Sequence, residues 1–277
     1  MPATLPSVSP QLKTASPHTP SNPEASTTRV LFRSLGQSPV QSQESTRVFR
    51  LDQPIIITID GPAGTGKSSV ARQLAQKLGL DFLDTGAMYR AAAAIAIDQK
   101  IAPVDEAALV RKVMEADLHF DWHEDPPAML AWGKPINHRI RDLDVTSVVS
   151  PIAGIATLRE HMVMKQRIIA RQHPRLVSEG RDQGSVVFPD AHVKFFLTAS
   201  VEERARRRAQ QLIEGGQAAD VNQLAGEIDV RDKSDMNRKV GPLTQPVNAV
   251  VLDTSALNFA QVVDELERIV RKKSREP

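Results

Sequence analysis

The feature that most constrains the fold is a glycine-rich segment between a short apolar run and a helical pattern. Residues 61–68 read Gly-Pro-Ala-Gly-Thr-Gly-Lys-Ser and match the phosphate-binding pattern G-x-x-x-x-G-K-[ST] in full. The run before it, residues 55–60, is typical of a strand buried on both faces of a parallel sheet. A helical pattern over residues 68–78 follows the loop. This order predicts the first half of a β-α-β unit.

The predicted loop has the residue types that hold a purine nucleoside triphosphate. Its glycines let backbone N–H groups converge on the β-phosphate, and the helix N-terminus adds a partial positive charge. Lys67 is expected to bridge the β- and γ-phosphates, and Ser68 to ligate Mg²⁺. The predicted ATP-binding residues are Gly61, Pro62, Ala63, Gly64, Thr65, Gly66, Lys67, Ser68 and Ser69. Taken alone, the loop does not separate a kinase from a GTPase, an ATPase motor or a transporter subunit.

The rest of the chain continues the alternation of strand and helix patterns. Short apolar runs occur at 81–83, 176–178, 193–197 and 249–252, and helical patterns at 87–98, 152–171, 201–213 and 259–272. Between 118 and 136 the pattern changes to short alternating segments broken by two prolines and a glycine. We therefore expect an α/β fold, with a five-stranded parallel sheet wound by helices and a small antiparallel insert.

The first 53 residues differ from the rest in composition. They are rich in Ser, Thr, Pro and Gln without a sustained period, which predicts a disordered leader before a domain at about 54–273. Few acidic residues and several arginines are also typical of an organelle transit peptide, although the composition favours a solvated tail. These arginines are Arg29, Arg33, Arg47 and Arg50.

Composition also limits the classes of function. The absence of cysteine excludes disulfides, thiolate nucleophiles and zinc–thiolate sites, and it fits a reducing interior such as the cytoplasm. A net charge of +2 provides no strong field for nucleic acid, although local arginine clusters could hold phosphates. We expect no nucleic-acid partner and neither membrane insertion nor export.

Three further polar segments each lie at the edge of a predicted strand or helix. Residues 84–90 (Asp-Thr-Gly-Ala-Met-Tyr-Arg) place a hydroxyl and an arginine at a helix N-terminus, although Thr85 as an N-cap and Arg90 as a solvated residue explain them equally well. Residues 179–184 follow a strand at the edge where ligands of parallel sheets bind. Residues 231–238 end a polar helical region whose arginines also fit a solvated face.

Together, the loop and these three segments resemble bacterial cytidylate kinases in order and spacing, over about residues 54–273. The resemblance implies a P-loop kinase core at about 54–117 and 172–273, an acceptor-binding insert at about 118–150 and a helical lid at about 201–238. It implies transfer of the γ-phosphoryl group of ATP to CMP or dCMP, with Mg²⁺ as cofactor. We also expect the protein to be a monomer. Adenylate, guanylate and thymidylate kinases share the loop but not the whole series.

The resemblance also assigns roles to individual residues. The implied acceptor contacts are Thr85, Arg90, Ser150, Arg159, Arg181, Asp182, Arg231, Asp235 and Arg238. The implied catalytic residues, which neutralise charge on the transferring group, are Lys67, Arg181, Arg204, Arg207 and Arg208. Ser150 directly precedes a proline, the residue type favoured at the first helical position, so a structural N-cap explains it equally well.

The chemistry of phosphoryl transfer fits this residue set. The attacking oxygen of a nucleoside monophosphate is already anionic, so no general base is needed, and several cations offset the repulsion between two polyanions. A carboxylate beside a guanidinium, Asp182 with Arg159, complements the amino donor and the acceptors of cytosine and mismatches uracil. Alternatively, Asp182 serves only as a structural partner of Arg181.

Two other functions stay open at this point. One is a P-loop kinase for another small substrate, such as UMP, a deoxynucleotide or shikimate. The other is a nucleotide-binding regulatory or RNA-associated module that uses its arginines for backbone phosphates. Arginines spread over separate motifs and few aromatic residues argue against the RNA-associated module.

Overall fold

The computed structural model describes residues 50–102 and 104–274, so most of the predicted leader lies outside the described residues. Five parallel strands form the central sheet in the order β2-β6-β1-β7-β8. The strands are β1 (Ile55–Asp60), β2 (Asp81–Asp84), β6 (Arg175–Gly180), β7 (Val193–Thr198) and β8 (Val250–Asp253). The predicted five-stranded parallel sheet is confirmed.

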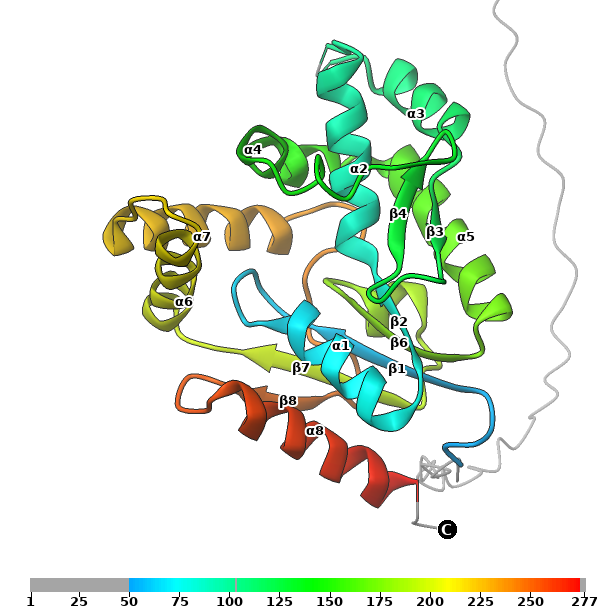
Figure 1. The fold of residues 1–277 in the computed structure, drawn as a ribbon, viewed down its shortest axis with the longest axis vertical. Helices are drawn as coiled ribbons and strands as arrows, with labels where there is room; N and C mark the ends of the chain where they lie inside the picture. The colour runs from blue at the N-terminus through cyan, green and yellow to red at the C-terminus, as the bar shows by residue number, and fades with distance from the viewer. Residues whose placement is uncertain (1–49, 103, 275–277) are drawn as a thin grey trace, which may run out of the picture. The chain divides into compact units, whose positions relative to one another are not determined.

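Both faces of this sheet are covered by helices (Figure 1). Ile55, Ile57 and Ile59 of β1 are fully buried on the face that packs against α1 (Lys67–Leu78) and α8 (Phe259–Lys273). Ile56 packs into the core on the other face, which includes α2 (Thr85–Asp98) and α5 (Ala156–Gln172). Since helices bury both of its faces, β1 has an apolar sequence without polar alternation.

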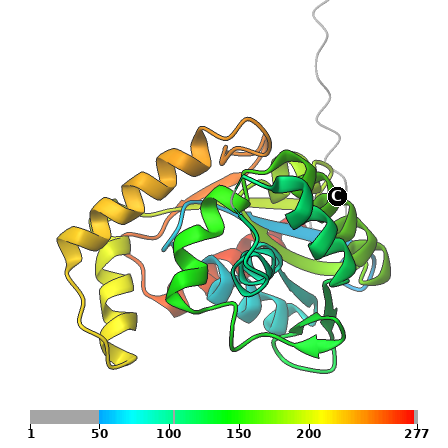
Figure 2. The same cartoon turned by 90° about the horizontal axis from the view of Figure 1, so that it is seen from above.

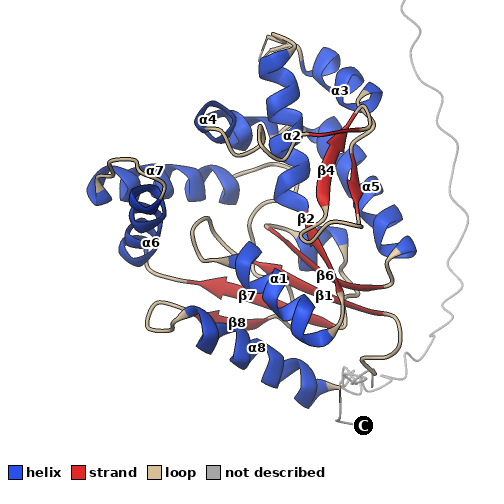
Figure 3. Ribbon diagram, in the orientation of Figure 1, coloured by secondary structure: helices blue, strands red, loops and turns tan. Residues whose placement is uncertain are grey.

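The insert is a separate three-stranded antiparallel sheet, as predicted (Figure 3). It consists of β3 (His119–Asp121), β4 (Ala128–Ala131) and β5 (Lys134–Pro135), and it lies between α3 (Glu106–Glu115) and α4 (Leu143–Ile152). Trp132 and Gly133 join β4 to β5 with φ values of 50° and 70°. Two consecutive positive φ angles are typical of a tight hairpin turn whose twist matches the strands.

The helical pattern predicted over 152–171 corresponds to α5, which begins four residues later than predicted. Helix α4 ends at Ile152 and α5 begins at Ala156, with Gly154 in the break. Ser150 and Pro151 lie in the last turn of α4, so the explanation of Ser150 as an N-cap is wrong. The proline does not mark a helix start here because α4 already began eight residues earlier, at Leu143.

Two helices extend beyond the carboxyl ends of the sheet strands. Helix α6 (Val201–Glu214) follows β7, and α7 (Val221–Met236) packs beside it (Figures 1 and 2). Side-chain caps define both starts: Ser200 Oγ accepts the N–H of Glu203 at 3.1 Å, and Asp220 accepts that of Asn222 at 2.8 Å. A π-helical turn, η1 (Gln183–Val187), follows β6. Within residues 50–102 and 104–274, none of the helices combines the length and apolar character required to cross a membrane.

Candidate active site

The phosphate-binding loop connects the end of β1 to the start of α1. Its glycines at 61, 64 and 66 have φ angles of 148°, 81° and 84°, which other L-residues rarely adopt. At Gly61 a Cβ atom would come within 2.2 Å of the Leu197 carbonyl oxygen of β7. A side chain at this position would therefore force the loop away from the sheet edge.

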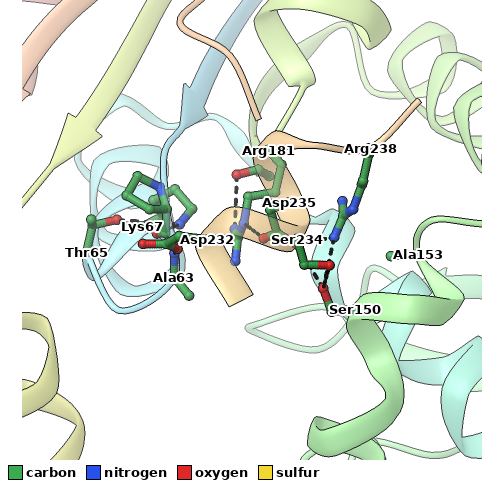
Figure 4. A network of polar contacts seen from close by, with 12 residues as sticks. Ala63, Thr65, Lys67, Ser150, Ala153, Arg181, Asp232, Ser234, Asp235 and Arg238 are labelled. Carbon is green, nitrogen blue, oxygen red and sulfur yellow. Dashed lines mark hydrogen bonds and ion pairs between the residues drawn. The ribbon is translucent and has the colours of Figure 1, made fainter. Parts of the chain in front are cut away.

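Lys67 folds back over the loop. Its Nζ donates to the Pro62 carbonyl at 2.6 Å and to Thr65 Oγ1 at 3.4 Å, and the residue is buried (Figure 4). Burial lowers the pKa of the Lys67 ammonium, and the neighbouring Arg181 lowers it further. A triphosphate in the loop would supply the negative charge that a buried ammonium lacks here.

A carboxylate lies directly beside the predicted magnesium ligand. Ser68 Oγ donates to Glu179 Oε1 at 2.7 Å. Burial and the nearby charge of Asp84 raise the pKa of Glu179 to about 7. A hydroxyl and a carboxylate are the oxygen donors that Mg²⁺ prefers, so these residues fit the ion. Among the described residues no group of three or more metal-ligating side chains exists, so phosphate and water would supply most of the ligands.

The predicted site residues from six segments line one cavity of about 360 Å³. Those on the cavity wall are Ala63, Gly64, Gly66, Lys67, Ser68, Ser69, Thr85, Arg90, Ser150, Arg159, Arg181, Asp182, Arg207, Arg208, Arg231, Asp235 and Arg238. Gly61, Pro62, Thr65 and Arg204 are not on the wall. A larger cavity of about 710 Å³, between α1, α2 and the insert, has none of the predicted acceptor contacts on its wall.

One buried carboxylate organises the arginines of this cavity. Asp235 Oδ2 accepts from Arg181 Nε at 2.9 Å, and Asp235 Oδ1 pairs with Arg238 and accepts from Ser150 Oγ at 3.0 Å (Figure 4). Burial lowers the pKa of the adjacent Arg231 to about 10, and Arg181 contributes to that shift. Three guanidinium groups around one carboxylate leave an excess of positive charge, which suits a phosphate.

Asp182 pairs with Arg159, as predicted from cytosine recognition, and not with Arg181. Both members of the pair are almost fully buried, at 4% and 2% side-chain exposure. Arg159 Nη1 also donates to the Ala153 carbonyl at 3.0 Å, and its guanidinium carbon lies 5.3 Å from the centre of the Tyr89 ring. The alternative pairing of Asp182 is wrong because Asp235 occupies the Arg181 side chain.

The second helix N-terminus is capped by Asp84 and not by Thr85. Asp84 Oδ1 accepts the Ala87 N–H at 2.8 Å, whereas Thr85 Oγ1 donates to the Glu179 carbonyl at 2.7 Å. Arg90 is half-buried and donates to Asp84 Oδ2 at 2.8 Å, so its description as a solvated helix residue is wrong as well. Both of these predicted acceptor residues lie on the wall of the cavity.

The arginines of α6 divide into two groups. Arg207 and Arg208 line the cavity, and Arg207 Nη1 donates to Thr254 Oγ1 at 3.0 Å. Arg204 lies behind the loop: its Nη1 donates to Asp232 Oδ2 at 2.5 Å and to the Ala63 carbonyl at 3.0 Å. Partners therefore occupy the guanidinium of Arg204 in this arrangement, and its predicted contact with the transferring group stays a prediction.

A comparison with known families decides what kind of protein this is. The family described as Cytidylate kinase matches residues 57–272. The chain belongs to the cytidylate kinase family. The cytidylate kinase of Mycobacterium avium (strain 104) is 43% identical over 220 residues, which are 79% of this chain and 96% of that protein. That of Rhodopirellula baltica is 44% identical over 218 residues, 79% and 93% of the two chains.

Among solved structures, a gluconokinase from Sinorhizobium meliloti matches with a TM-score of 0.40 and 17% identity, over 82% of this chain and 100% of the other. The stronger sequence matches confirm the resemblance to cytidylate kinases that the motifs indicate.

In this member of the cytidylate kinase family, several buried carboxylates support the site and were not predicted to belong to it. Asp60, Asp84, Glu179 and Asp232 each accept a hydrogen bond from a loop, a helix terminus or a site side chain. Asp84, Glu179 and Asp232 stand inside the quoted motifs, which was the available signal. The contact of Asp232 with the loop spans 169 residues, so no local pattern indicates it.

Proposed function

We propose that this enzyme transfers the γ-phosphoryl group of ATP to CMP or dCMP, giving ADP and CDP or dCDP. The observation that carries the proposal is the buried pair of Asp182 and Arg159 in the same cavity as the phosphate-binding loop. A base-reading pair and a triphosphate loop on one cavity are what a pyrimidine monophosphate kinase requires. Membership of the cytidylate kinase family supports the same reaction.

Base selection follows from the hydrogen-bonding groups of the two pyrimidines. The Asp182 carboxylate accepts from the exocyclic amino group of cytosine, and Arg159 donates to the ring acceptors. Uracil presents a carbonyl and an N–H in the same places. The Asp182 carboxylate would then face another acceptor, and Arg159 would face another donor. An unmatched buried contact costs about 1 to 3 kcal/mol, which corresponds to roughly tenfold to a few hundredfold discrimination.

Positive side chains on the wall of the cavity bring the two phosphates together. Arg90, Arg181 and Arg238 hold the acceptor phosphate, whose oxygen attacks without a general base because it is already anionic. Lys67, with Arg207 or Arg208, offsets the charge that spreads over the migrating group. These residues position the reactants and neutralise charge, and none of them takes up a proton.

Ser68 and Glu179 would hold Mg²⁺, which when bound neutralises charge on the β- and γ-phosphates. The hydroxyl and the carboxylate lie at the mouth of the loop, 2.7 Å apart.

We assign the mobile parts of the enzyme to two segments. Helices α6 and α7, within about 201–238, act as a lid that excludes water, and the insert at about 118–150 closes over the acceptor. Exposed apolar side chains on these two helices, Ile213 (56%) and Val230 (69%), are consistent with a surface that becomes covered on closure. We assign the enzyme to the cytoplasm, on the basis of its lack of cysteine.

A coupled ADP-release assay with each nucleoside monophosphate in turn tests the function. We expect CMP and dCMP to be the best acceptors, with UMP tenfold or more weaker and purine nucleotides and shikimate inactive, as the estimate for one unmatched contact indicates. Comparable efficiency with UMP would contradict base recognition by Asp182. Absence of phosphotransfer to any monophosphate would contradict the proposed reaction.

A further inference from the structure

Asp60 is a fully buried carboxylate that holds the backbone just after Asp182. It is the last residue of β1 and is not on the cavity wall. Its Oδ1 accepts the N–H of Gln183 at 2.8 Å, and its Oδ2 accepts the N–H of Gly184 at 2.7 Å. Both carboxylate oxygens of Asp60 therefore accept hydrogen bonds from the turn that follows Asp182, the proposed base-reading residue.

This turn is a π-helix, a conformation that is rare and forms mostly as single turns at functional sites. Asp182 is its N-cap residue, and the Asp182 carbonyl accepts the Val186 N–H at 2.9 Å. At the opposite end Arg167 donates to the carbonyls of Val186 and Val187 at 2.9 and 3.0 Å. Charged side chains from β1 and α5 thus hold both ends of the turn.

The side chain of Gln183 connects the same turn to its surroundings. Its Oε1 accepts from Ser178 Oγ at 2.8 Å, and its Nε2 donates to Gln166 Oε1 at 3.2 Å. Gln166 lies on α5, two helical turns after Arg159. The turn with Asp182 and the helix with Arg159 are therefore joined by a second buried contact besides the ion pair itself.

An aspartate at position 60 is explained by the hydrogen bonds that it makes to the turn, and not by a gain in folding stability. Two backbone N–H donors need two acceptor oxygens at this depth, and a carboxylate of this length supplies both, whereas an asparagine supplies one acceptor and one donor. Burial raises the pKa of Asp60 to about 7, against the effect of the Gly184 and Gln183 N–H groups. Accepting two N–H groups requires the ionised form of Asp60, which burial at this position disfavours.

We propose that Asp60 is a positioning residue that fixes the cytosine-reading carboxylate of Asp182 relative to the phosphate-binding loop. The proposal rests on the proposed function. Because Asp60 ends β1 and Gly61 opens the loop, Asp60 joins the two sites, through its peptide bond to Gly61 and through its two hydrogen bonds to the acceptor turn.

The test is Asp60→Asn, which keeps the shape and places an NH₂ group against one of the two backbone N–H donors. We expect the ratio of CMP to UMP kcat/KM to fall about tenfold or more, by loss of the buried contact that Asp182 makes. The KM for ATP should change less than about threefold, because no loop hydrogen bond is removed. When Asp182 is already replaced by Asn, Asp60→Asn should not change the CMP-to-UMP ratio of kcat/KM any further, because the contact that it positions is already lost.

A matched control is Asp232→Asn. Asp232 is also a buried carboxylate, and it accepts the backbone N–H of Ala63 at 3.3 Å. It supports the loop and not the acceptor turn, so we expect a raised KM for ATP with an unchanged CMP-to-UMP ratio. Equal loss of CMP and UMP efficiency in Asp60→Asn would overturn the positioning role. If the unsubstituted enzyme phosphorylates neither nucleotide, the proposed function fails instead, together with the inference that rests on it.

Thermal unfolding is measured for each variant. If Asp60→Asn does not fold, Gln183→Met removes only the two side-chain hydrogen bonds of the same turn. A smaller fall of the CMP-to-UMP ratio in that variant supports the inference, and an unchanged ratio overturns it.

Discussion

Arg204 and Asp232 form a buried ion pair that holds both polar groups of one loop residue. Arg204 donates to the Ala63 carbonyl at 3.0 Å, and Asp232 accepts the Ala63 N–H at 3.3 Å. Since the pair joins α6 to α7, the two helices of the proposed lid are anchored at the phosphate-binding loop. Movement of these helices is therefore expected to change the shape of the loop.

The first prediction concerns this pair. Arg204→Met leaves Asp232 buried without its partner, so we expect a loss of about 3 to 5 kcal/mol in the free energy of unfolding. The KM for ATP should rise, because the loop loses a brace. Urea unfolding and steady-state kinetics measure both. Arg206→Met is the control: Arg206 is 67% exposed and pairs with Glu203 on the same helix, so a change under about 1 kcal/mol is expected. A fall in kcat alone would instead give Arg204 a role in the transition state.

The second prediction concerns Lys67. Lys67→Met should lower kcat by on the order of 10²- to 10³-fold or more, because a charge on the migrating group is left unmatched. Stability should hold or increase, since burial already lowers the pKa of this ammonium. At pH values below the usual pKa of lysine, the folded state bears the free-energy cost of a buried ammonium. Methionine has no charge, so the substitution removes that cost. Turnover close to that of the parent enzyme in a folded variant would refute the assignment of the loop.

The third prediction concerns Asp182. Asp182→Asn removes a charge-assisted contact to the cytosine amino group, so CMP efficiency should fall roughly tenfold to a hundredfold, or about 1.5 to 3 kcal/mol. The gap between CMP and UMP should narrow, while the KM for ATP changes little. Kinetics with both acceptors provide the measurement. If kcat/KM for CMP and kcat/KM for UMP fall by the same factor, Asp182 has only a structural role in the site.

The fourth prediction is a pH dependence from Glu179. Its pKa in the folded enzyme is about 7, above the value of 4.5 expected when unfolded, because of burial and the Asp84 charge. This group therefore contributes stability below about pH 4.5, and that contribution is lost as pH rises to about 7. Glu179→Gln should flatten this part of the stability profile. The KM for magnesium-bound ATP should rise several-fold below about pH 7 in the parent enzyme only, since the carboxyl must ionise to bind the metal. An identical stability profile in the variant would contradict the assignment.

The fifth prediction concerns the start of the domain. Deletion of residues 1–49 should leave kcat/KM for CMP within about twofold, because every residue on the cavity wall lies between 63 and 238. Deletion of residues 1–53 should lower the melting temperature, since Leu51 packs on the core and its carbonyl accepts from Arg175 Nε at 3.1 Å. Loss of activity in the shorter deletion would show that the leader contributes to the site.

The sequence alone determined the architecture and indicated the segments that meet at the cavity, because those signals are local. The apolar run at 55–60 and the glycines after it specify a doubly buried strand and a loop with positive φ angles. Proline and glycine punctuation likewise indicated the antiparallel insert. The start of α5 was predicted four residues too early, and the helix α4 before it was not predicted.

Only the tertiary structure decided which charged groups pair. Arg159 and Arg181 have the same type of side chain, so Asp182 could have formed an ion pair with either. In the folded protein Asp235 pairs with Arg181, 54 residues away in the sequence, and Asp182 pairs with Arg159. In the same way Arg204 was drawn beneath the loop and Asp60 against the acceptor turn. A long flexible cation forms an ion pair with whichever carboxylate lies within reach, and that distance is set by packing between elements far apart in the chain.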